Sequence, residues 1–259
     1  MRKVKAKKHL GQHFLTDLSI ALDTVDAFGQ KERFKYALEV GPGMGVLTKP
    51  LLNRAELEVF VVDIDTESVA FLKEESTLDD EHLIEGDFLK LDLNKLFHGE
   101  KFGIIGNFPY NISTQILFKA LEYKDQAMEV VGMFQKEVAE RIASPEGSKV
   151  YGITSILLQA FYDIEYLFTV DENVFNPPPK VKSAVIKLTR NNVKDLGCDE
   201  KLFKILIKSS FNQRRKTMRN SLKPFLKDSI KGNEIFNKRP EQISVQGFIE
   251  LTNFIQGAE

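Results

Sequence analysis

The stretch LEVGPGMGVLT, residues 38–48, decides the predicted fold. The apolar run YALEV (36–40) leads into three alternate glycines, and the helix-like GVLTKPLLNR (45–54) follows. A strand, a glycine-rich turn and a helix in this order let a ligand approach backbone N–H groups at the positive end of a helix. A glycine-rich turn alone is weak evidence, so the neighbouring segments decide what it binds.

Strand-like and helix-like segments continue to alternate after this turn. The regular alternation predicts an α/β fold, a Rossmann-like, mostly parallel sheet with helices on both faces. The last two strand-like runs lie close together and are expected to close the sheet by antiparallel pairing. The strand-like runs are EVFVV (58–62), HLIEG (82–86), FGIIG (102–106), EVVGMF (129–134), IEYLFTV (164–170) and SAVIKLT (183–189).

The pattern changes near Asn191, after which only helical periodicity is found. The helical runs are EKLFKILIKSSF (200–211), TMRNSLKPFL (217–226) and PEQISVQGFIELTNFI (240–255). We therefore predict two domains: a catalytic α/β domain over residues 1–192 and a small all-α domain over 193–259.

Composition is that of an ordinary globular protein, with 42% hydrophobic and 28% charged residues among 259. No apolar run approaches the length of a membrane span. The basic start MRKVKAKKHLGQHFL lacks an apolar core, so we expect neither a signal peptide nor an anchor, and a cytoplasmic location. The single cysteine, Cys198, excludes an internal disulfide, and the scattered histidines lack ligand spacing, so no metal is expected.

Charge is segregated along the chain although the net charge is only -1. Residues 201–227 contain nine Lys or Arg and no acid. This segment predicts a phosphate-binding surface, although two solvated basic helices would look the same. The cations assigned to that surface are Arg214, Arg215, Lys216 and Arg219, which lie between two helical patterns, together with Lys7 and Lys8 near the N-terminus.

Two acids follow successive predicted strands. Asp63 ends the strand after the glycine turn, and Asp87 follows the next strand in EGDF. These positions suit an adenosine whose ribose lies on Asp63 and whose exocyclic amine lies on Asp87. The spacing is G-x-G-x-G, and no helix N-terminus is reserved for a pyrophosphate. We therefore expect S-adenosylmethionine rather than a dinucleotide, bound by Gly41, Gly43 and both acids.

The stretch GNFPYNIS (106–113) follows the fourth predicted strand on the same edge. Pro109 fixes its own φ and keeps Phe108 extended, so the segment is a rigid ledge. Its simplest interpretation is a turn with Tyr110 in the core. Beside a cofactor, however, the Asn107 side-chain oxygen and the Phe108 carbonyl can accept both hydrogens of an exocyclic amine, while Tyr110 stacks on the base.

These motifs, together with GQHFL (11–15) and FNQRRKTMRNSL (211–222), resemble the small-subunit ribosomal RNA adenine-N6,N6-dimethyltransferase family, which includes the kasugamycin-resistance methyltransferase. The resemblance covers the whole chain. It implies that His13, Leu15 and Asn107 contact the cofactor and that Phe175 holds the target base against Tyr110. Without it, Phe175 reads as a core residue.

The resemblance also implies a substrate. It predicts dimethylation of two adjacent adenosines in a hairpin loop near the 3′ end of 16S-type RNA, within a partly assembled 30S-type subunit, by a monomer. Three residues depart from the family pattern: Phe108 stands for Leu, Asp63 for Glu and His13 for Asn. None removes a required atom.

Three alternatives remain at this stage. A macrolide-resistance type enzyme would modify large-subunit RNA, but the segment 211–222 matches the small-subunit family. A non-catalytic RNA-binding assembly or transcription factor would not need Asn107 and Tyr110. A dinucleotide-dependent oxidoreductase is the most distant.

Overall fold

The computed structural model of the chain describes residues 4–29, 33–227 and 229–257. It divides into two compact units. The first unit comprises residues 1–139 and 163–190, and the second comprises 140–162 and 191–259. The longer segment of the second unit begins at residue 191, close to the predicted domain boundary at residue 193. The second unit also contains residues 140–162, which were assigned to the first domain. The assignment of 193–259 as a separate domain stays a prediction.

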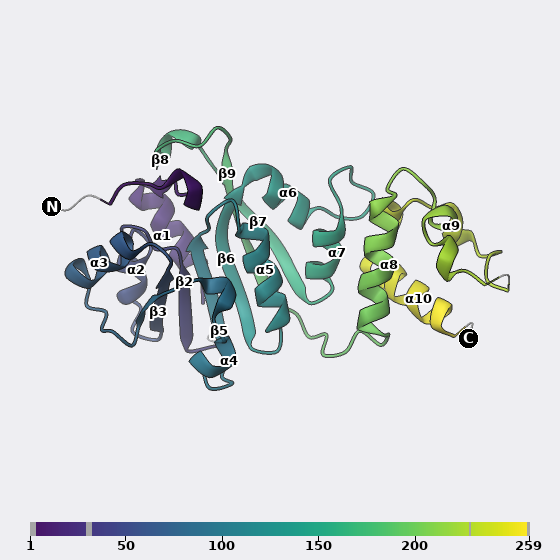
Figure 1. Ribbon diagram of the computed structural model, residues 1–259, viewed down its shortest axis with the longest axis horizontal. Coiled ribbons are helices and arrows are strands. Elements are labelled where there is room, and N and C mark those ends of the chain that lie inside the picture. The colour runs from purple at the N-terminus through teal and green to yellow at the C-terminus, as the bar shows by residue number, and fades with distance from the viewer. Residues whose placement is uncertain (1–3, 30–32, 228, 258–259) are drawn as a thin grey trace. The chain divides into compact units, whose positions relative to one another are not determined.

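A seven-stranded sheet carries the order β4-β3-β2-β5-β6-β9-β7 (Figure 1). Its first five strands are parallel neighbours, and β9 pairs antiparallel with β6. The mostly parallel sheet and its antiparallel closing strand are therefore confirmed. The strands are β2 (Tyr36–Val40), β3 (Glu58–Asp63), β4 (Leu83–Glu85), β5 (Phe102–Asn107), β6 (Ala127–Gln135), β7 (Tyr162–Val170) and β9 (Ser183–Arg190).

The direction of the chain across the sheet reverses at β2. From β2 the chain moves to β3 and β4, and it then returns to β5 and β6 on the other side. Right-handed crossovers place the helices of these two halves on opposite faces, and the reversal leaves a crevice at the carboxyl ends of β2 and β5. The helices are α1 (Leu18–Asp26), α2 (Thr48–Leu52), α3 (Thr66–Glu75), α4 (Leu93–Leu96), α5 (Ser113–Glu122) and α6 (Lys136–Ala143).

The helix after the glycine turn is shorter than predicted. It was expected over 45–54, but α2 begins at Thr48. Gly43 and Gly45 have positive φ values of 55° and 77°. These left-handed conformations cannot belong to a right-handed helix, so the turn extends further along the chain.

A second, two-stranded sheet was not predicted. It pairs β1 (Phe14–Leu15) with β8 (Phe175–Asn176) in antiparallel fashion, and Leu15 stands opposite Phe175. Both side chains are 3% exposed and belong to the hydrophobic core of the sheet. This pairing decides the outcome for two predicted site residues below.

Among its described residues, the second unit has no strand residue other than Tyr162, the first of β7, and it includes the end of α6 from Glu140. Its helices are α7 (Ile153–Gln159), α8 (Glu200–Asn212), α9 (Met218–Ser221) and α10 (Val245–Gln256), with short 3₁₀ turns η4 (Lys223–Phe225), η5 (Glu234–Asn237) and η6 (Pro240–Gln242). The helix expected over 217–226 is interrupted after Ser221, and Pro224, which has no N–H, lies in a separate turn. The helix expected from Pro240 begins instead after Ser244, whose hydroxyl accepts from Gly247 N at 3.0 Å.

Candidate active site

A cavity of about 210 Å³ lies at the carboxyl edge of the parallel strands. We name it the edge cavity. The predicted residues that line it come from the ends of four neighbouring strands and from the N-terminal segment: His13, Gly41, Gly43, Asp63, Asp87, Asn107, Phe108, Pro109 and Tyr110. The structure therefore brings most of the predicted site together.

The glycine turn forms one wall of the edge cavity. Gly41 and Gly43 both have positive φ, at 72° and 55°. A Cβ added to Gly43 would lie 2.7 Å from the Phe14 ring, so a side chain there would displace the N-terminal segment. The Gly43 N–H donates to Asp63 Oδ2 at 3.4 Å. Only glycine satisfies both the backbone conformation and the close approach.

Asp63 ends β3 and is only 6% exposed. Its Oδ1 accepts from Asp65 N at 2.9 Å, which fixes the carboxylate against the β3–α3 turn. Burial raises the pKa of Asp63 to about 6. A buried carboxylate with so few donors can accept further hydrogen bonds from a ligand hydroxyl, and such bonds favour its ionised form.

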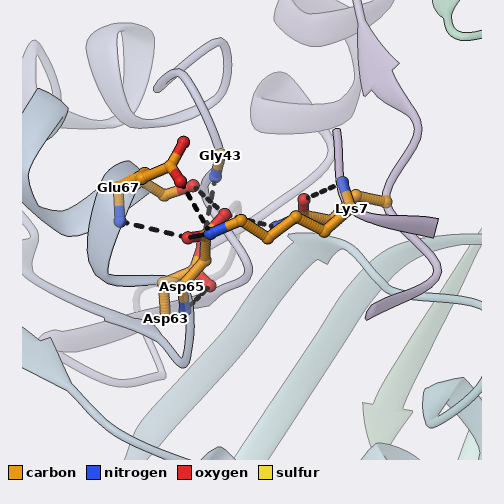
Figure 2. A network of polar contacts seen from close by, with 7 residues as sticks. Lys7, Gly43, Asp63, Asp65 and Glu67 are labelled. Atoms are coloured by element: carbon orange, nitrogen blue, oxygen red, sulfur yellow. Dashed lines mark hydrogen bonds and ion pairs between the residues drawn. The ribbon is translucent and has the colours of Figure 1, made fainter. Parts of the chain in front are cut away.

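Asp65 ties the N-terminal segment to this turn (Figure 2). Its Oδ1 accepts from Lys7 Nζ at 2.5 Å and from Glu67 N at 3.0 Å. Its Oδ2 accepts from Gln12 Nε2 at 3.0 Å. Burial alone would raise the pKa of Asp65, but Lys7 and Gln12 hold it below its usual range. The turn that carries Asp63 is thus fastened to the segment that covers the edge cavity.

Lys7 was predicted to contact RNA, and its position argues against that role. Its ammonium also lies 3.2 Å from Glu67 Oε1, so two carboxylates surround it (Figure 2). The hydrogen bond to Asp65 raises the pKa of Lys7. A cation already paired inside the protein contributes little to phosphate binding. Lys8, by contrast, is exposed.

Asp87 lies one strand further along. It caps η2 (Phe88–Lys90), and its Oδ1 accepts from Leu89 N at 3.0 Å. Gly86, Phe88 and Leu89 join it in lining the edge cavity. A carboxylate beside apolar side chains at this position suits an adenine ring and its exocyclic amine.

The ledge after β5 is held by burial of the Phe108 side chain. That side chain is 1% exposed and packs edge-on against Phe134, with the ring centroids 5.2 Å apart. Gly106 and Gly132 stand opposite each other on β5 and β6, and a Cβ on either would meet the Phe108 ring at 2.8 Å or less. The two glycines make room for the Phe108 ring, which is bulkier than the Leu of the family pattern.

The Asn107 side chain is oriented by the N-terminal segment. Its Nδ2 donates to His13 O at 2.8 Å. The other end of the amide, Oδ1, is consequently the acceptor. This arrangement leaves Asn107 Oδ1 and the adjacent Phe108 carbonyl as two acceptors in neighbouring positions on a fixed backbone.

Tyr110 is fixed by two contacts. Its hydroxyl is hydrogen-bonded to Ser183 Oγ at 2.5 Å, and its ring stacks on His13 with centroids 5.3 Å apart and planes at 29°. His13 Nδ1 lies 2.7 Å from Pro177 O. Burial raises the pKa of Tyr110, so its ring remains a neutral surface at physiological pH.

A second cavity, of about 430 Å³, is also lined by the His13 and Tyr110 side chains. We name it the proline cavity, because Pro177, Pro178 and Pro179 line it. It shares His13 and Tyr110 with the edge cavity, and Lys8 and Lys180 add positive charge to its wall. The two cavities therefore meet at the Tyr110 end of the ledge.

Leu15 and Phe175 line neither the edge cavity nor the proline cavity, but Leu15 does line a small cavity of about 20 Å³ together with Gly41 and Asn107. Their strands pair directly, and their apolar side chains are buried in the core of the sheet. Phe175 does not line the edge or the proline cavity. The prediction that Phe175 stands opposite Tyr110 as a base-stacking wall is wrong for this structure. The Phe175 ring is packed in the hydrophobic core and is not available to stack on a base.

Glu39 was not singled out from the sequence. It precedes the glycine turn on β2, is 1% exposed, and its Oε2 has no hydrogen-bond partner among the described residues. Burial raises the pKa of Glu39 to about 8. It lines a small cavity of about 20 Å³ beside Gly41 and Asn107. An acid inside the predicted strand YALEV was the available signal.

Three cations of the basic segment, Arg214, Arg215 and Lys216, lie between α8 and α9, as predicted, whereas Arg219 lies within α9. Arg214 donates to the carbonyls of Ser148 and Lys149, and Arg219 donates to Lys231 O and, at 3.0 Å, to Asn237 Oδ1. These two arginines hold the unit's own loops.

The neighbouring cations of this segment, Arg215 and Lys216, are exposed. The four predicted cations therefore divide into two that fasten loops and two that face solvent.

The described part of the chain lacks two features. No group of three or more His, Cys, Asp or Glu side chains there is arranged to hold a metal ion. No helix there has the length and apolar character to cross a membrane.

The chain is similar to known proteins over nearly its whole length. The family model described as "Ribosomal RNA adenine dimethylase" matches residues 3–254. The ribosomal RNA small subunit methyltransferase A of Bacteroides thetaiotaomicron is 59% identical over 263 residues, covering 100% of this chain and 97% of that protein. Its counterpart in Cytophaga hutchinsonii is 59% identical over 258 residues, covering 99% and 100%.

Solved structures extend the likeness to the fold. A dimethyladenosine transferase from Plasmodium falciparum superimposes with a TM-score of 0.78 at 25% identity, covering 92% of this chain and 96% of that one. The 23S rRNA methyltransferase ErmE gives a TM-score of 0.68 at 22% identity, covering 93% and 99%. At that identity the second likeness shows the fold alone.

Proposed function

The chain belongs to the ribosomal RNA adenine dimethylase family, and from that premise we propose that it methylates N6 of two adjacent adenosines, using S-adenosylmethionine. The target is a hairpin loop near the 3′ end of small-subunit ribosomal RNA. The observation that carries the proposal is the junction of two cavities at the ledge, where Asn107 and Tyr110 lie.

The residues of the edge cavity fit S-adenosylmethionine. The Asp63 carboxylate suits ribose hydroxyls, and Asp87 with Phe88 suits the adenine. Glu39 Oε2 is a buried acceptor without a described partner, which the cofactor's ammonium would satisfy. The missing Cβ of Gly43 makes room for the Phe14 ring against the glycine turn. When bound, the cofactor supplies an electrophilic methyl group.

The ledge supplies the chemistry on the substrate side. The lone pair of an adenine amine is delocalised into the ring, so the amine is a poor nucleophile. Asn107 Oδ1 and the Phe108 carbonyl accept its two hydrogens and favour a tetrahedral nitrogen whose lone pair is free to react. Once the amine has taken the methyl group and S-adenosylhomocysteine is left, the methylated nitrogen is very acidic and loses its proton to water, so no strong base is needed. Positioning therefore carries most of the catalysis.

We place the target base in the proline cavity, against the Tyr110 ring. A base in a paired stack is out of reach, so the adenosine is turned out of its loop. His13 already stacks on Tyr110. The entering base therefore either displaces the His13 imidazole from the Tyr110 ring or stacks on Tyr110 beside it. The proline run gives the opposite wall a rigid backbone.

The RNA is gripped by exposed cations, with Arg215 and Lys216 as the pair that we assign first. Lys8 and Lys180 guide the flipped nucleotide at the proline cavity. We further propose that the enzyme acts as a monomer in the cytoplasm on a partly assembled 30S-type subunit.

The test is mass spectrometry of the 3′ segment of small-subunit RNA from cells with the gene, without it, and with the Asn107→Ala gene. We expect dimethyladenosine only with the wild-type gene. If the RNA carries the same modification in all three strains, the enzymatic proposal fails. If the deletion strain and the Asn107→Ala strain both keep the modification, but subunit assembly is impaired in the deletion strain, the protein is better explained as a non-catalytic assembly factor.

A further inference from the structure

Lys119 is a buried lysine that the proposed chemistry does not use. It lies on α5, directly after the ledge, and is 7% exposed. A lysine is almost never buried to this extent unless its ammonium has partners. Burial lowers the pKa of Lys119, while the charges of Glu122, Asp87 and Asp92 act in the opposite direction.

The partners of Lys119 are backbone carbonyls of one short segment. Its Nζ donates to Leu89 O at 2.9 Å and to Leu91 O at 2.5 Å. These carbonyls belong to the end of η2, where the last carbonyls of a helical turn lack partners within the turn. The same ammonium lies 5.4 Å from the centre of the Phe88 ring. One side chain thus contacts Phe88, Leu89 and Leu91 of this segment.

That segment forms the adenine end of the edge cavity. Gly86, Asp87, Phe88 and Leu89 all line it. Asp87 holds the beginning of η2 by accepting from Leu89 N, and Lys119 holds its end. The Lys119 ammonium itself does not line the cavity, so it acts on a ligand only through the segment.

We propose that Lys119 is a positioning residue that sets the adenine-recognition segment 86–89 and thereby the affinity for S-adenosylmethionine. The proposal rests on the proposed function, because it assumes that this cavity takes the adenosine half of the cofactor. Lys119 links α5, the helix that follows the ledge, to the segment that binds the cofactor's adenine. The substrate side and the cofactor side of the site are thus connected through one side chain.

A second buried lysine provides a matched control. Lys187 is 5% exposed, lies 3.2 Å from Glu129 Oε2 and donates to Ala27 O at 2.6 Å. Neither Lys187 nor these partners line the edge cavity. Loss of its charge disturbs the same unit without touching segment 86–89.

The experiment measures binding of S-adenosylhomocysteine by calorimetry to wild type, Lys119→Met and Lys187→Met, at a temperature where circular dichroism shows each to be folded. We expect Lys119→Met to weaken binding by about tenfold or more and Lys187→Met to change it by less than about twofold. With saturating cofactor, kcat and the KM for RNA of Lys119→Met should stay near wild type, while the KM for the cofactor rises.

Wild-type affinity in Lys119→Met, or equal losses in both variants, would overturn the positioning role. If Lys119→Met does not fold, Lys119→Gln and Lys187→Gln repeat the comparison with a neutral amide that keeps two N–H donors. A wild-type protein that binds no S-adenosylhomocysteine would instead overturn the proposed function, and the positioning role with it.

Discussion

The carboxyl edge of the sheet and the basic segment 213–219 hold their functional side chains in different ways. At the edge, Asp63, Asp65 and Asn107 are each hydrogen-bonded to another segment, through Gly43, Gln12 and His13 respectively. In the basic segment, Arg214 and Arg219 are bound to loops of their own unit, whereas Arg215 and Lys216 point into solvent. A motif that fixes the backbone also fixes its side chains, while a charged run does not.

The largest effect is expected at the edge, from Asn107→Ala. Loss of one of two acceptors for the reacting amine should lower the single-turnover rate of methyl transfer by about 100- to 1000-fold, the usual scale for removing one preorganised group. Affinity for S-adenosylhomocysteine should change far less. Asn94→Ala, at an exposed position of α4 that does not line the edge cavity, is the control. Equal rates for Asn107→Ala and wild type would remove Asn107 from the mechanism.

The next effect concerns cofactor affinity. Asp63→Ala should weaken binding of S-adenosylmethionine by about 1 to 3 kcal/mol, or about 5- to 150-fold, because the ribose hydroxyls lose their acceptor. Calorimetry measures the change, with the exposed Asp80→Ala as the matched control. An unchanged affinity would show that the ribose binds elsewhere.

The same carboxylate should give cofactor binding a dependence on pH. Burial raises the pKa of Asp63 to about 6, so below that pH the Asp63 carboxyl of the ligand-free protein is protonated. Ribose hydroxyls need the ionised form, so affinity should fall by about tenfold for each unit below pH 6 and level off above it. 5′-Methylthioadenosine is the suitable ligand, because it lacks the ammonium assigned to Glu39. Asp63→Asn should bind weakly and without this pH dependence; the same profile in Asp63→Asn would assign the proton to another group.

The smallest effect is expected in the basic segment, and it separates its two kinds of cation. Removing Arg215 and Lys216 together should lower the salt slope of RNA binding by about 1.5, corresponding to two lost phosphate contacts. Arg214→Ala should leave the slope nearly unchanged and lower the melting temperature instead, since it frees loop carbonyls. Filter binding at several salt concentrations measures the slope. An unaltered slope in the double variant would mean that the segment is an ordinary solvated surface.

Much of the edge was predictable because strand ends and turn residues determine it locally. The alternation of strands and helices alone predicts that Gly41, Asp63, Asp87 and Asn107 lie at one edge, and all four line the edge cavity. Phe175 was misplaced because its role depends on which surface its ring faces, and pairing of β1 with β8 is a long-range contact that no local pattern predicts. The ion pair of Lys7 could not be predicted for a similar reason, because its partner Asp65 lies 58 residues away along the chain.

The shortened helices have local causes that were available in the sequence. Gly45 extends the turn before α2, and Pro224 ends the helix after Ser221. Lys119 and Glu39 were missed because a single charged residue in a helix or strand usually faces water. Only the structure shows that both are buried beside the cavity walls.

The central claim is that cofactor and target base meet across the ledge from two different cavities. A crystal structure of the protein with S-adenosylhomocysteine and adenosine 5′-monophosphate tests it most directly. We predict S-adenosylhomocysteine in the edge cavity with its ribose on Asp63, and the second adenine in the proline cavity, stacked on Tyr110 with its N6 near Asn107 Oδ1. An adenine held between Tyr110 and an exposed Phe175, or bound away from Asn107, would contradict the account.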